Sequence, residues 1–252
     1  MKFVLLPVLL LSVCCCLSLR PAPGPITTLI IDAGHGGKDP GAVGARFYEK
    51  DITLRVALRL RDLLREQMPD LRVVLTREDD QFVTFERRAT IAQANKGDFF
   101  ISIHCNSMKL KNRQGAEAYV LGINEGQEGY ETYIKENEAA LFEENYREVY
   151  GGFDPRSPEG VIYFKVLKDV YRAESTRMAG LIQQQLHHRA LRTDRGVKQA
   201  PFFVLYLSGM PSVLCEIGFI SNPQEEIFLG SDLGQTAIAS SICQAIRQYQ
   251  TQ

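Results

Sequence analysis

Three short apolar runs in this chain each lead into residues that can carry chemistry. Residues 28–31 (TLII) precede the glycine-rich segment DAGHGG, residues 99–103 (FFISI) precede His104, and residues 212–215 (SVLC) precede Glu216. Runs of this length that are rich in β-branched residues are typical of buried strands. Between them, apolar residues recur at helical spacing. This alternation predicts a mainly parallel sheet that is covered by helices on both faces.

The same periodicity gives the expected order of the other elements. Helices are expected over residues 50–68, 84–95 and 169–188, with a closing helix that carries Leu233 to Tyr249 on its inner stripe. Further strands are expected over residues 73–75 and 116–121. With about 100–200 residues per domain as a guide, we expect one α/β domain over residues 25–252, with a mixed, mostly parallel sheet flanked by helices.

Composition excludes several classes of protein. The chain has 252 residues, with 29 Lys and Arg against 30 Asp and Glu, so its formal net charge is −1. A general nucleic-acid binder needs a basic excess to displace counterions, so no nucleic-acid partner is expected. The 45% of hydrophobic residues is ordinary for a folded domain and argues against a disordered chain.

The first 24 residues are typical of a secretory signal followed by a linker. Lys2 is followed by an almost wholly apolar run from Phe3 to Leu19, which RPAPGP then ends. We expect export to the periplasm or cell envelope. An uncleaved anchor is the alternative, although the run is short and contains Pro7. In a third interpretation, one of the cysteines at 14–16 (CCC) accepts a lipid. In a fourth, these cysteines are only apolar residues of the signal.

Three of the six cysteines lie outside the apolar N-terminal run: Cys105, Cys215 and Cys243. An odd, sparse set is not a disulfide framework. We expect Cys105 and Cys215 to be small buried side chains, because each lies in an apolar run. One bridge between these two remains open if their strands are neighbours.

Two histidines and a glutamate fall where a metal site could form. His35 follows the first strand, His104 ends another, and Glu49 opens the first helix, where the helix dipole favours its charged form. Ligands of open parallel sheets gather at the carboxyl ends of the strands. Two His and one Glu match a catalytic zinc site, with Glu216 as proton acceptor and donor. Structural roles, such as a hydrogen-bonded His or a capping Glu, are the alternative. We expect His187 and His188 to be surface residues.

Four segments resemble the zinc-dependent N-acetylmuramoyl-L-alanine amidases of the AmiA/AmiB/AmiC type, which are bacterial peptidoglycan hydrolases. They are residues 30–42 (IIDAGHGGKDPGA), 49–52 (EKDI), 100–106 (FISIHCN) and 213–222 (VLCEIGFISN). Four segments in the right order are more specific than one short motif. The resemblance runs from about Thr28 to the C-terminus.

The resemblance implies Zn²⁺ bound by His35, Glu49 and His104, with Glu216 as the catalytic residue. It implies hydrolysis of the amide between the lactyl group of N-acetylmuramic acid and the L-alanine of the stem peptide. The partner would then be peptidoglycan, in wall remodelling and daughter-cell separation, and we expect a monomer. Asp32 and Asn106 are candidates for holding the imidazoles, although Asp32 could instead satisfy loop backbone groups.

The segment over about residues 125–160 is rich in Glu and Tyr and short of aliphatic residues. Some relatives carry an insert helix that blocks the zinc until an activator protein binds. Residues 135–140 (KENEAA) align with that helix, so we expect Glu136, or alternatively Glu138, to be an autoinhibitory residue. A solvated helix face is the competing interpretation.

Two other functions share these motifs. A zinc carboxypeptidase that trims the stem peptide would use the same metal chemistry. A non-catalytic wall-binding protein would keep the fold but would be expected to lose a ligand or the catalytic Glu, and all four positions are filled here.

Overall fold

Six strands form one mixed sheet in the computed structural model, which describes residues 24–122, 130–144 and 158–251. The strand order is β2-β1-β3-β6-β4-β5. The strands are β1 (Thr28–Ala33), β2 (Arg72–Leu75), β3 (Phe99–Asn106), β4 (Ala116–Leu121), β5 (Asp194–Ala200) and β6 (Ser212–Phe219). Only the β4–β6 pair is antiparallel, and the other pairs are parallel. The expectation of a mixed, mostly parallel sheet is confirmed.

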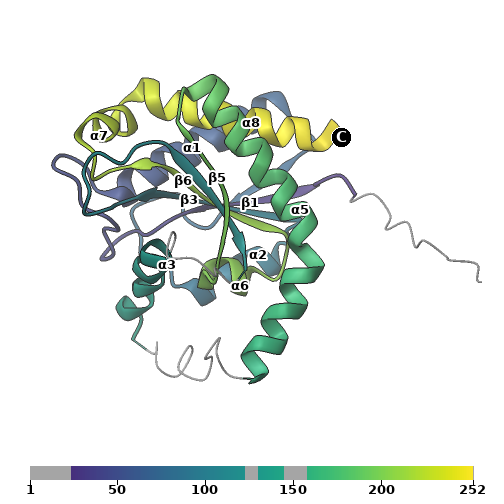
Figure 1. Cartoon of the computed structure of the whole chain (residues 1–252). Coiled ribbons are helices and arrows are strands. Elements are labelled where there is room, and N and C mark those ends of the chain that lie inside the picture. Colours follow the sequence, from purple (N-terminus) through teal and green to yellow (C-terminus); the bar gives the residue numbers. More distant parts are fainter. Residues whose placement is uncertain (1–23, 123–129, 145–157, 252) are drawn as a thin grey trace, which may run out of the picture.

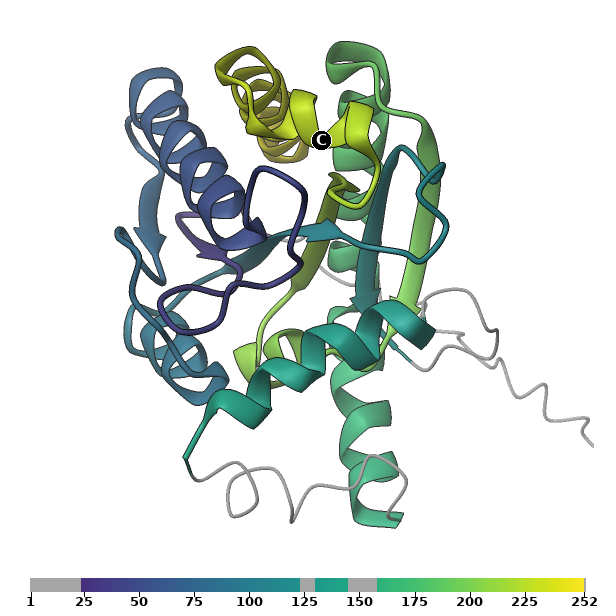
Figure 2. The ribbon, with the colours of Figure 1, turned by 90° about the vertical axis from the view of Figure 1, so that its left-hand side faces the viewer.

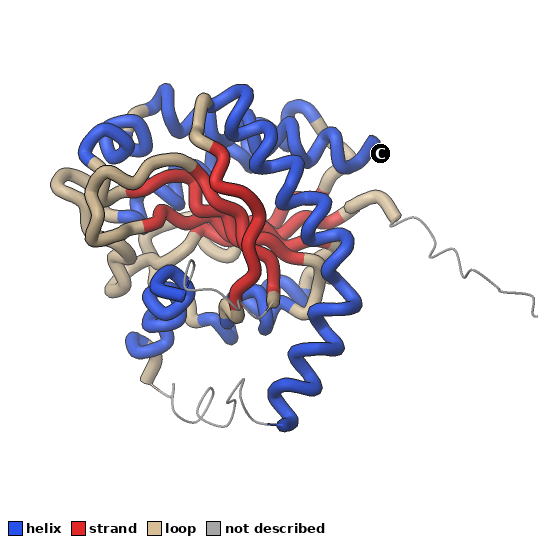
Figure 3. The backbone as a smooth tube through the Cα atoms, in the orientation of Figure 1, coloured by secondary structure: helices blue, strands red, loops and turns tan. Residues whose placement is uncertain are grey.

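Helices cover both faces of the sheet, which lies at the centre of the molecule (Figures 1 and 3). One hydrophobic core joins the sheet to α1 (Glu49–Gln67), α5 (Pro158–Ala190), α7 (Pro223–Gly230) and α8 (Asp232–Thr251). A second core joins the other face to α2 (Phe85–Ala94), the 3₁₀ helix η1 (Glu138–Phe142) and α6 (Phe203–Ser208). The two-sided covering explains why the central strands are apolar on both faces.

Local capping accounts for several helix ends. The Thr84 hydroxyl accepts a hydrogen bond from the Arg87 backbone N–H and so starts α2 where the sequence predicts. The Asn222 side chain accepts hydrogen bonds from the backbone N–H groups of Gln224 and Glu225 and so starts α7, with Pro223 at the first helical position. Both caps satisfy backbone donors that a helix start leaves without a partner.

The structure differs from the expectations at three elements. The strand β5 and the short helix α6 are not predicted from the sequence, and α5 begins at Pro158 rather than at residue 169. Cys105, Cys215 and Cys243 are all buried free thiols, so the Cys105–Cys215 bridge is not formed. The N-terminal run that is interpreted as a signal lies outside the described residues.

The strands β1, β3 and β6 are neighbours and run in the same direction, so their carboxyl ends share one edge of the sheet. The segment of α3 (Tyr130–Asn137) and η1 lies on the opposite side of the sheet from α1, α7 and α8, as Figure 2 shows. It forms the described part of the predicted insert, while residues 123–129 and 145–157 lie outside the described residues. Among the helices that the structure describes, none combines the length and apolar character needed to cross a membrane.

Candidate metal centre

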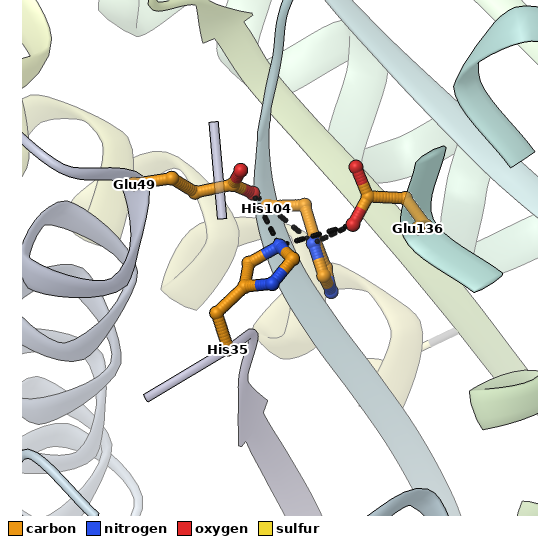
Figure 4. Close-up of side chains that lie close together, drawn as sticks. All are labelled: His35, Glu49, His104 and Glu136. Atoms are coloured by element: carbon orange, nitrogen blue, oxygen red, sulfur yellow. Dashed lines mark hydrogen bonds and ion pairs between the residues drawn. The ribbon is translucent and has the colours of Figure 1, made fainter. Parts of the chain in front are cut away.

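His35 lies in the tight loop after β1 and is held in one ring orientation. Its backbone has a left-handed φ of 60°, and its side chain is buried. The ring Nδ1 lies 2.8 Å from Asp39 Oδ2, which fits an Nδ1–H that donates to the carboxylate. This bond leaves Nε2 as the free ring nitrogen, which points toward His104 and Glu49 (Figure 4).

Glu49 opens α1 and is wholly buried. Its Oε2 accepts a bond of 2.7 Å from the Ala42 N–H, and its Oε1 accepts one of 2.8 Å from the Cys105 N–H. Burial raises the pKa of this carboxyl, but the charges of His35 and His104 outweigh burial and hold the pKa below its ordinary value. The carboxylate is therefore ionised and fixed by two separate segments of backbone.

His104 lies in β3, which continues for two residues beyond it instead of ending there. Its Nδ1 lies 3.1 Å from Glu49 Oε1, and its ring meets the His35 ring edge-on with 4.8 Å between centroids. Gly34 lies directly against this ring, since a Cβ at that position would come within 2.4 Å of it. The absence of a side chain at Gly34 thus leaves the room that His104 occupies.

Glu136 reaches the same point from α3. Its Oε2 lies 3.0 Å from His35 Nε2 and 2.8 Å from His104 Nδ1, as the dashed lines in Figure 4 show. The predicted contact of the insert with the site is therefore present geometrically at Glu136, whereas Glu138 is exposed to solvent.

The four side chains form a compact set of nitrogen and oxygen donors. One ligand atom from each of His35, Glu49, His104 and Glu136 lies within 4.8 Å of the others, and all four residues are buried. The contacts of His35 Nε2 and Glu136 Oε2 are short but do not meet hydrogen-bond geometry, so within the described ranges both atoms lack a hydrogen-bond partner. Two buried polar atoms that converge without a hydrogen-bond partner, beside two further donors, fit a cation at their centre.

The carboxylates also set the charge of the imidazoles. Burial lowers the pKa of both histidines, but Glu136 and Glu49 outweigh it: the pKa of His35 is raised well above its ordinary value and that of His104 to about 10. Without a metal, two imidazolium groups therefore neutralise two carboxylates. A divalent cation would replace their two protons, which conserves the charge of the site.

Glu216 lies within β6 rather than at its end, because the strand continues to Phe219. Its backbone is in register with His104 of β3 on one side and with Glu117 of β4 on the other. Neither carboxyl oxygen of Glu216 has a hydrogen-bond partner among the described residues, and the side chain is fully buried. Burial, followed by the charge of Glu136, raises its pKa well above the ordinary value. Such a carboxyl can hold a proton at neutral pH.

The two residues expected to hold the imidazoles, Asp32 and Asn106, form hydrogen bonds with other residues instead. Asp32 accepts bonds from Thr76, Ser102 and Arg88, which occupy both of its carboxylate oxygens. Asn106 contacts Glu117 and Thr132. The imidazole partner that sequence reasoning missed is Asp39, whose four-residue spacing from His35 in the loop was the available signal. His187 and His188 are exposed on α5, as expected.

A cavity of about 280 Å³ opens beside the cluster. Its lining includes His35, Gly41, Lys135, Glu138 and Phe142. The cavity lies between the loop after β1 and the α3–η1 segment, so a ligand there could approach the free side of the histidines.

The fold and site define an α/β protein with a buried two-histidine, two-carboxylate centre at the carboxyl edge of a mostly parallel sheet. Residues 29–248 match the N-acetylmuramoyl-L-alanine amidase family (Amidase_3), and the chain belongs to this family. The resemblance of the four motifs is thereby confirmed, and the protein is a peptidoglycan amidase. The carboxypeptidase and wall-binding alternatives are not favoured.

Relatives agree over nearly the whole chain. AmiC of Escherichia coli, an N-acetylmuramoyl-L-alanine amidase, is 30% identical over 91% of this chain, which spans 55% of AmiC. The uncharacterized protein YqiI of Bacillus subtilis is 34% identical over 94% of this chain and 91% of its own length. The chain thus spans about half of AmiC and most of YqiI.

A solved structure shares the fold. The CwlD amidase from Clostridioides difficile, in complex with the GerS lipoprotein, superimposes with a TM-score of 0.66 and 26% identity. The match covers 89% of this chain and 98% of that one.

Proposed function

We propose that this amidase is a zinc enzyme in which His35, Glu49 and His104 hold the metal. The observation that carries the proposal is the convergence of their ligand atoms with that of Glu136 in a buried set 4.8 Å across. Two imidazole nitrogens and a carboxylate oxygen are a donor set of catalytic zinc sites, in which a further position stays open. Zinc, when bound, would lower the pKa of a water molecule and polarise the amide carbonyl.

In the proposed reaction, Glu216 is the proton carrier. The bond that breaks joins the lactyl carbonyl carbon of N-acetylmuramic acid to the L-alanine nitrogen. The Glu216 carboxylate accepts a proton from the attacking water and then donates it to the leaving nitrogen, so the products are a lactyl carboxylate and a free amine. The position of Glu216 supports this role, because it is fully buried and lies in register with His104 on the neighbouring strand.

We further propose that Glu136 occupies the open position of the metal in a resting state. Its carboxylate already lies between the two histidines, where water and substrate would otherwise bind. An activator protein would relieve this block by moving α3. The CwlD structure was solved with a lipoprotein partner, which supports a search for an envelope protein as activator.

Export to the cell envelope, a monomeric state and a role in daughter-cell separation are proposed with this function. The apolar N-terminal run supports export, since peptidoglycan lies outside the cytoplasmic membrane. Fractionation of cells that produce the full chain, with and without that run, would test export directly.

A digest of peptidoglycan fragments tests the reaction. Zinc-loaded protein should release intact stem peptides with a free L-alanine amine, and a chelator should abolish the release. Mass spectrometry reads both products. The Glu216→Gln variant should bind zinc normally but lose at least about a hundredfold in rate, which is the usual contribution of general acid–base catalysis. Release of a terminal D-alanine instead would indicate a carboxypeptidase.

The resting-state proposal is tested by Glu136→Ala in the same digest. Removal of the carboxylate should raise basal activity about 5- to 150-fold, which is the change in equilibrium that typical coupling free energies between two sites produce. Glu131→Ala is the matched control, because Glu131 is exposed on the same helix and does not line the cavity beside the cluster. Equal basal activity in wild type and Glu136→Ala would reject the block.

A further inference from the structure

Two buried arginines lie beneath the loop that carries His35. Arg77, just after β2, is 1% exposed, and Arg88, on α2, is 3% exposed. Arginine is rarely buried to this degree unless its five N–H groups find partners. In this protein those partners are mainly backbone carbonyls, and they include Ala33 at the end of β1 and Gly34 and His35 in the loop that follows it. This loop reaches the metal-ligand cluster just beyond the arrowhead of β1 in Figure 4.

Arg88 joins the loop to the buried carboxylate of Asp32 on β1. Its Nη1 lies 2.5 Å from Asp32 Oδ1 and 2.7 Å from the Ala33 carbonyl oxygen. Its Nη2 donates to the His35 carbonyl oxygen over 2.8 Å. The side chain of Asp32 is the buried counter-charge, and Ser102 and Thr76 fix it from β3 and from the residue after β2. Arg88 thus holds the backbone of a ligand residue directly.

Arg77 joins the same loop to the helix of the second ligand. Its Nε donates to the Ala33 carbonyl over 3.0 Å, and its Nη2 donates to the Gly34 carbonyl over 2.9 Å. The same Nη2 reaches the Lys50 carbonyl over 2.8 Å, in the first turn of α1 beside Glu49. One guanidinium therefore links the backbone just before His35 to the backbone just after Glu49.

Three consecutive carbonyls, of Ala33, Gly34 and His35, thus point at the two cations. A left-handed backbone at a residue with a side chain, such as His35, is unfavourable and persists only when its surroundings enforce it. Bringing two cations together is also unfavourable: burial, then the charge of Arg88, lowers the pKa of Arg77 to about 10. The arrangement opposes these unfavourable contributions by satisfying carbonyls that would otherwise be buried without a partner.

We propose that Arg77 and Arg88 are positioning residues that fix the His35 ring and the Glu49 carboxylate at metal-binding separation before the metal arrives. The inference rests on the proposed metal site. The planar fork of each arginine reaches two or three carbonyls at once, which a single ammonium on a flexible stem cannot reproduce. Lysine at either position should therefore keep the charge but loosen the spacing of the two ligands.

The test compares metal binding in wild type, Arg77→Lys and Arg88→Lys. Zinc affinity is measured by competition with a chromophoric chelator, and ligand geometry by the visible absorption of the Co²⁺-substituted protein. Each variant should bind zinc about 10- to 100-fold more weakly, the usual effect of losing an outer partner of a ligand, and its Co²⁺ bands should shift. Arg59→Lys is the matched control, since Arg59 makes surface contacts with Asp232 and Thr236.

A milder variant keeps the test decisive if a lysine variant does not fold. Thr53 Oγ1 donates to the Gly34 carbonyl over 2.9 Å and lies 3.2 Å from Arg77 Nη2. Thr53→Val removes this link without changing any charge, and it should weaken zinc binding several-fold with a melting temperature of the metal-free protein close to that of wild type.

Unchanged zinc affinity and Co²⁺ spectra in the folded variants would overturn the positioning role, and so would an unchanged Thr53→Val if neither lysine variant folds. A wild-type protein that binds no zinc would overturn the metal site itself and this inference with it. The two failures are distinguishable because only the second involves the wild type.

Discussion

Two carboxylates face the same pair of histidines but are held in different ways. Glu49 belongs to α1, is fully buried, and accepts backbone bonds from Ala42 and Cys105. Glu136 belongs to α3 and keeps 8% of its surface exposed. Its Oε2 lies near both histidines but has no hydrogen-bond partner among the described residues. One carboxylate is fixed by the scaffold, and the other is held in place by the histidines.

In the proposed metal site, this difference separates a permanent ligand from a displaceable one. Moving Glu49 would leave the buried N–H of Cys105 without an acceptor, which costs about 1–3 kcal/mol, and would also free the half-buried N–H of Ala42. Moving Glu136 breaks the contacts with the cluster, the bonds that anchor α3 and the packing of Tyr133 on the second core. A bound metal and water could replace the contacts with the cluster. In the proposal, a carboxylate therefore binds the metal permanently at Glu49 and regulates access to the metal at Glu136.

The largest effect is expected from Glu49→Ala. Loss of a ligand that backbone bonds hold in place should weaken zinc binding by more than about a hundredfold, beyond the usual effect of losing an outer partner. Chelator competition measures the affinity, and Glu66→Ala, on the exposed face of the same helix, is the control. If Glu49→Ala bound zinc as wild type does while Glu136→Ala did not, the two roles would be reversed.

The second effect is a pH dependence of zinc affinity. The raised pKa of His35, and that of His104 at about 10, mean that both rings are protonated near pH 7 in the metal-free protein. Because zinc must displace these protons, its apparent affinity should rise with pH, by up to about a hundredfold per unit when two protons leave. Glu136→Ala should make zinc affinity depend less on pH, since Glu136 raises the pKa of both histidines. Calorimetry in buffers of different ionisation enthalpy counts the protons released, and equal counts in the two proteins would contradict the expectation.

The same protonation acts on stability in the metal-free protein. A histidine whose folded pKa is raised stabilises the fold fully below its unfolded value of about 6.5. This stabilisation is lost as pH rises through the folded value, which for His104 is about 10. Between these limits the melting temperature of the metal-free wild type should therefore fall with rising pH, and that of Glu136→Ala should fall less.

The smallest effect is expected from Asn137→Ala. The Asn137 side chain donates to the Pro201 carbonyl over 3.1 Å and accepts from the Phe203 N–H over 3.0 Å, so it fastens the end of α3 to the start of α6. Its loss should weaken the hold on Glu136 and raise basal amidase activity a few-fold, in line with about 1 kcal/mol for ordinary hydrogen bonds. Glu131→Ala, at an exposed position of α3, is the control. An activity no higher than that of the control would show that Asn137 does not restrain the segment.

The sequence predicted most of the fold for a local reason. The strands β1, β3 and β6 are short runs whose residues are buried on both faces, so their apolar composition is visible without any partner. The strand β5 was missed because it lies at the edge of the sheet and most of its residues are only partly buried. Its sequence DRGVKQA therefore carries no buried run.

What the sequence by itself determined is the set of side chains that can carry the chemistry: His35, Glu49, His104 and Glu216 each stand beside an apolar run or a helix start that predicts their place at one sheet edge. Only the tertiary structure decided which polar groups hold them. Asp39 rather than Asp32 is hydrogen-bonded to His35, and Glu136 rather than Glu138 contacts the histidines. Two arginines, one just after β2 and one on α2, hold the loop. The physical reason is that apolar periodicity records burial, whereas these hydrogen bonds depend on distances between segments that are far apart in the chain.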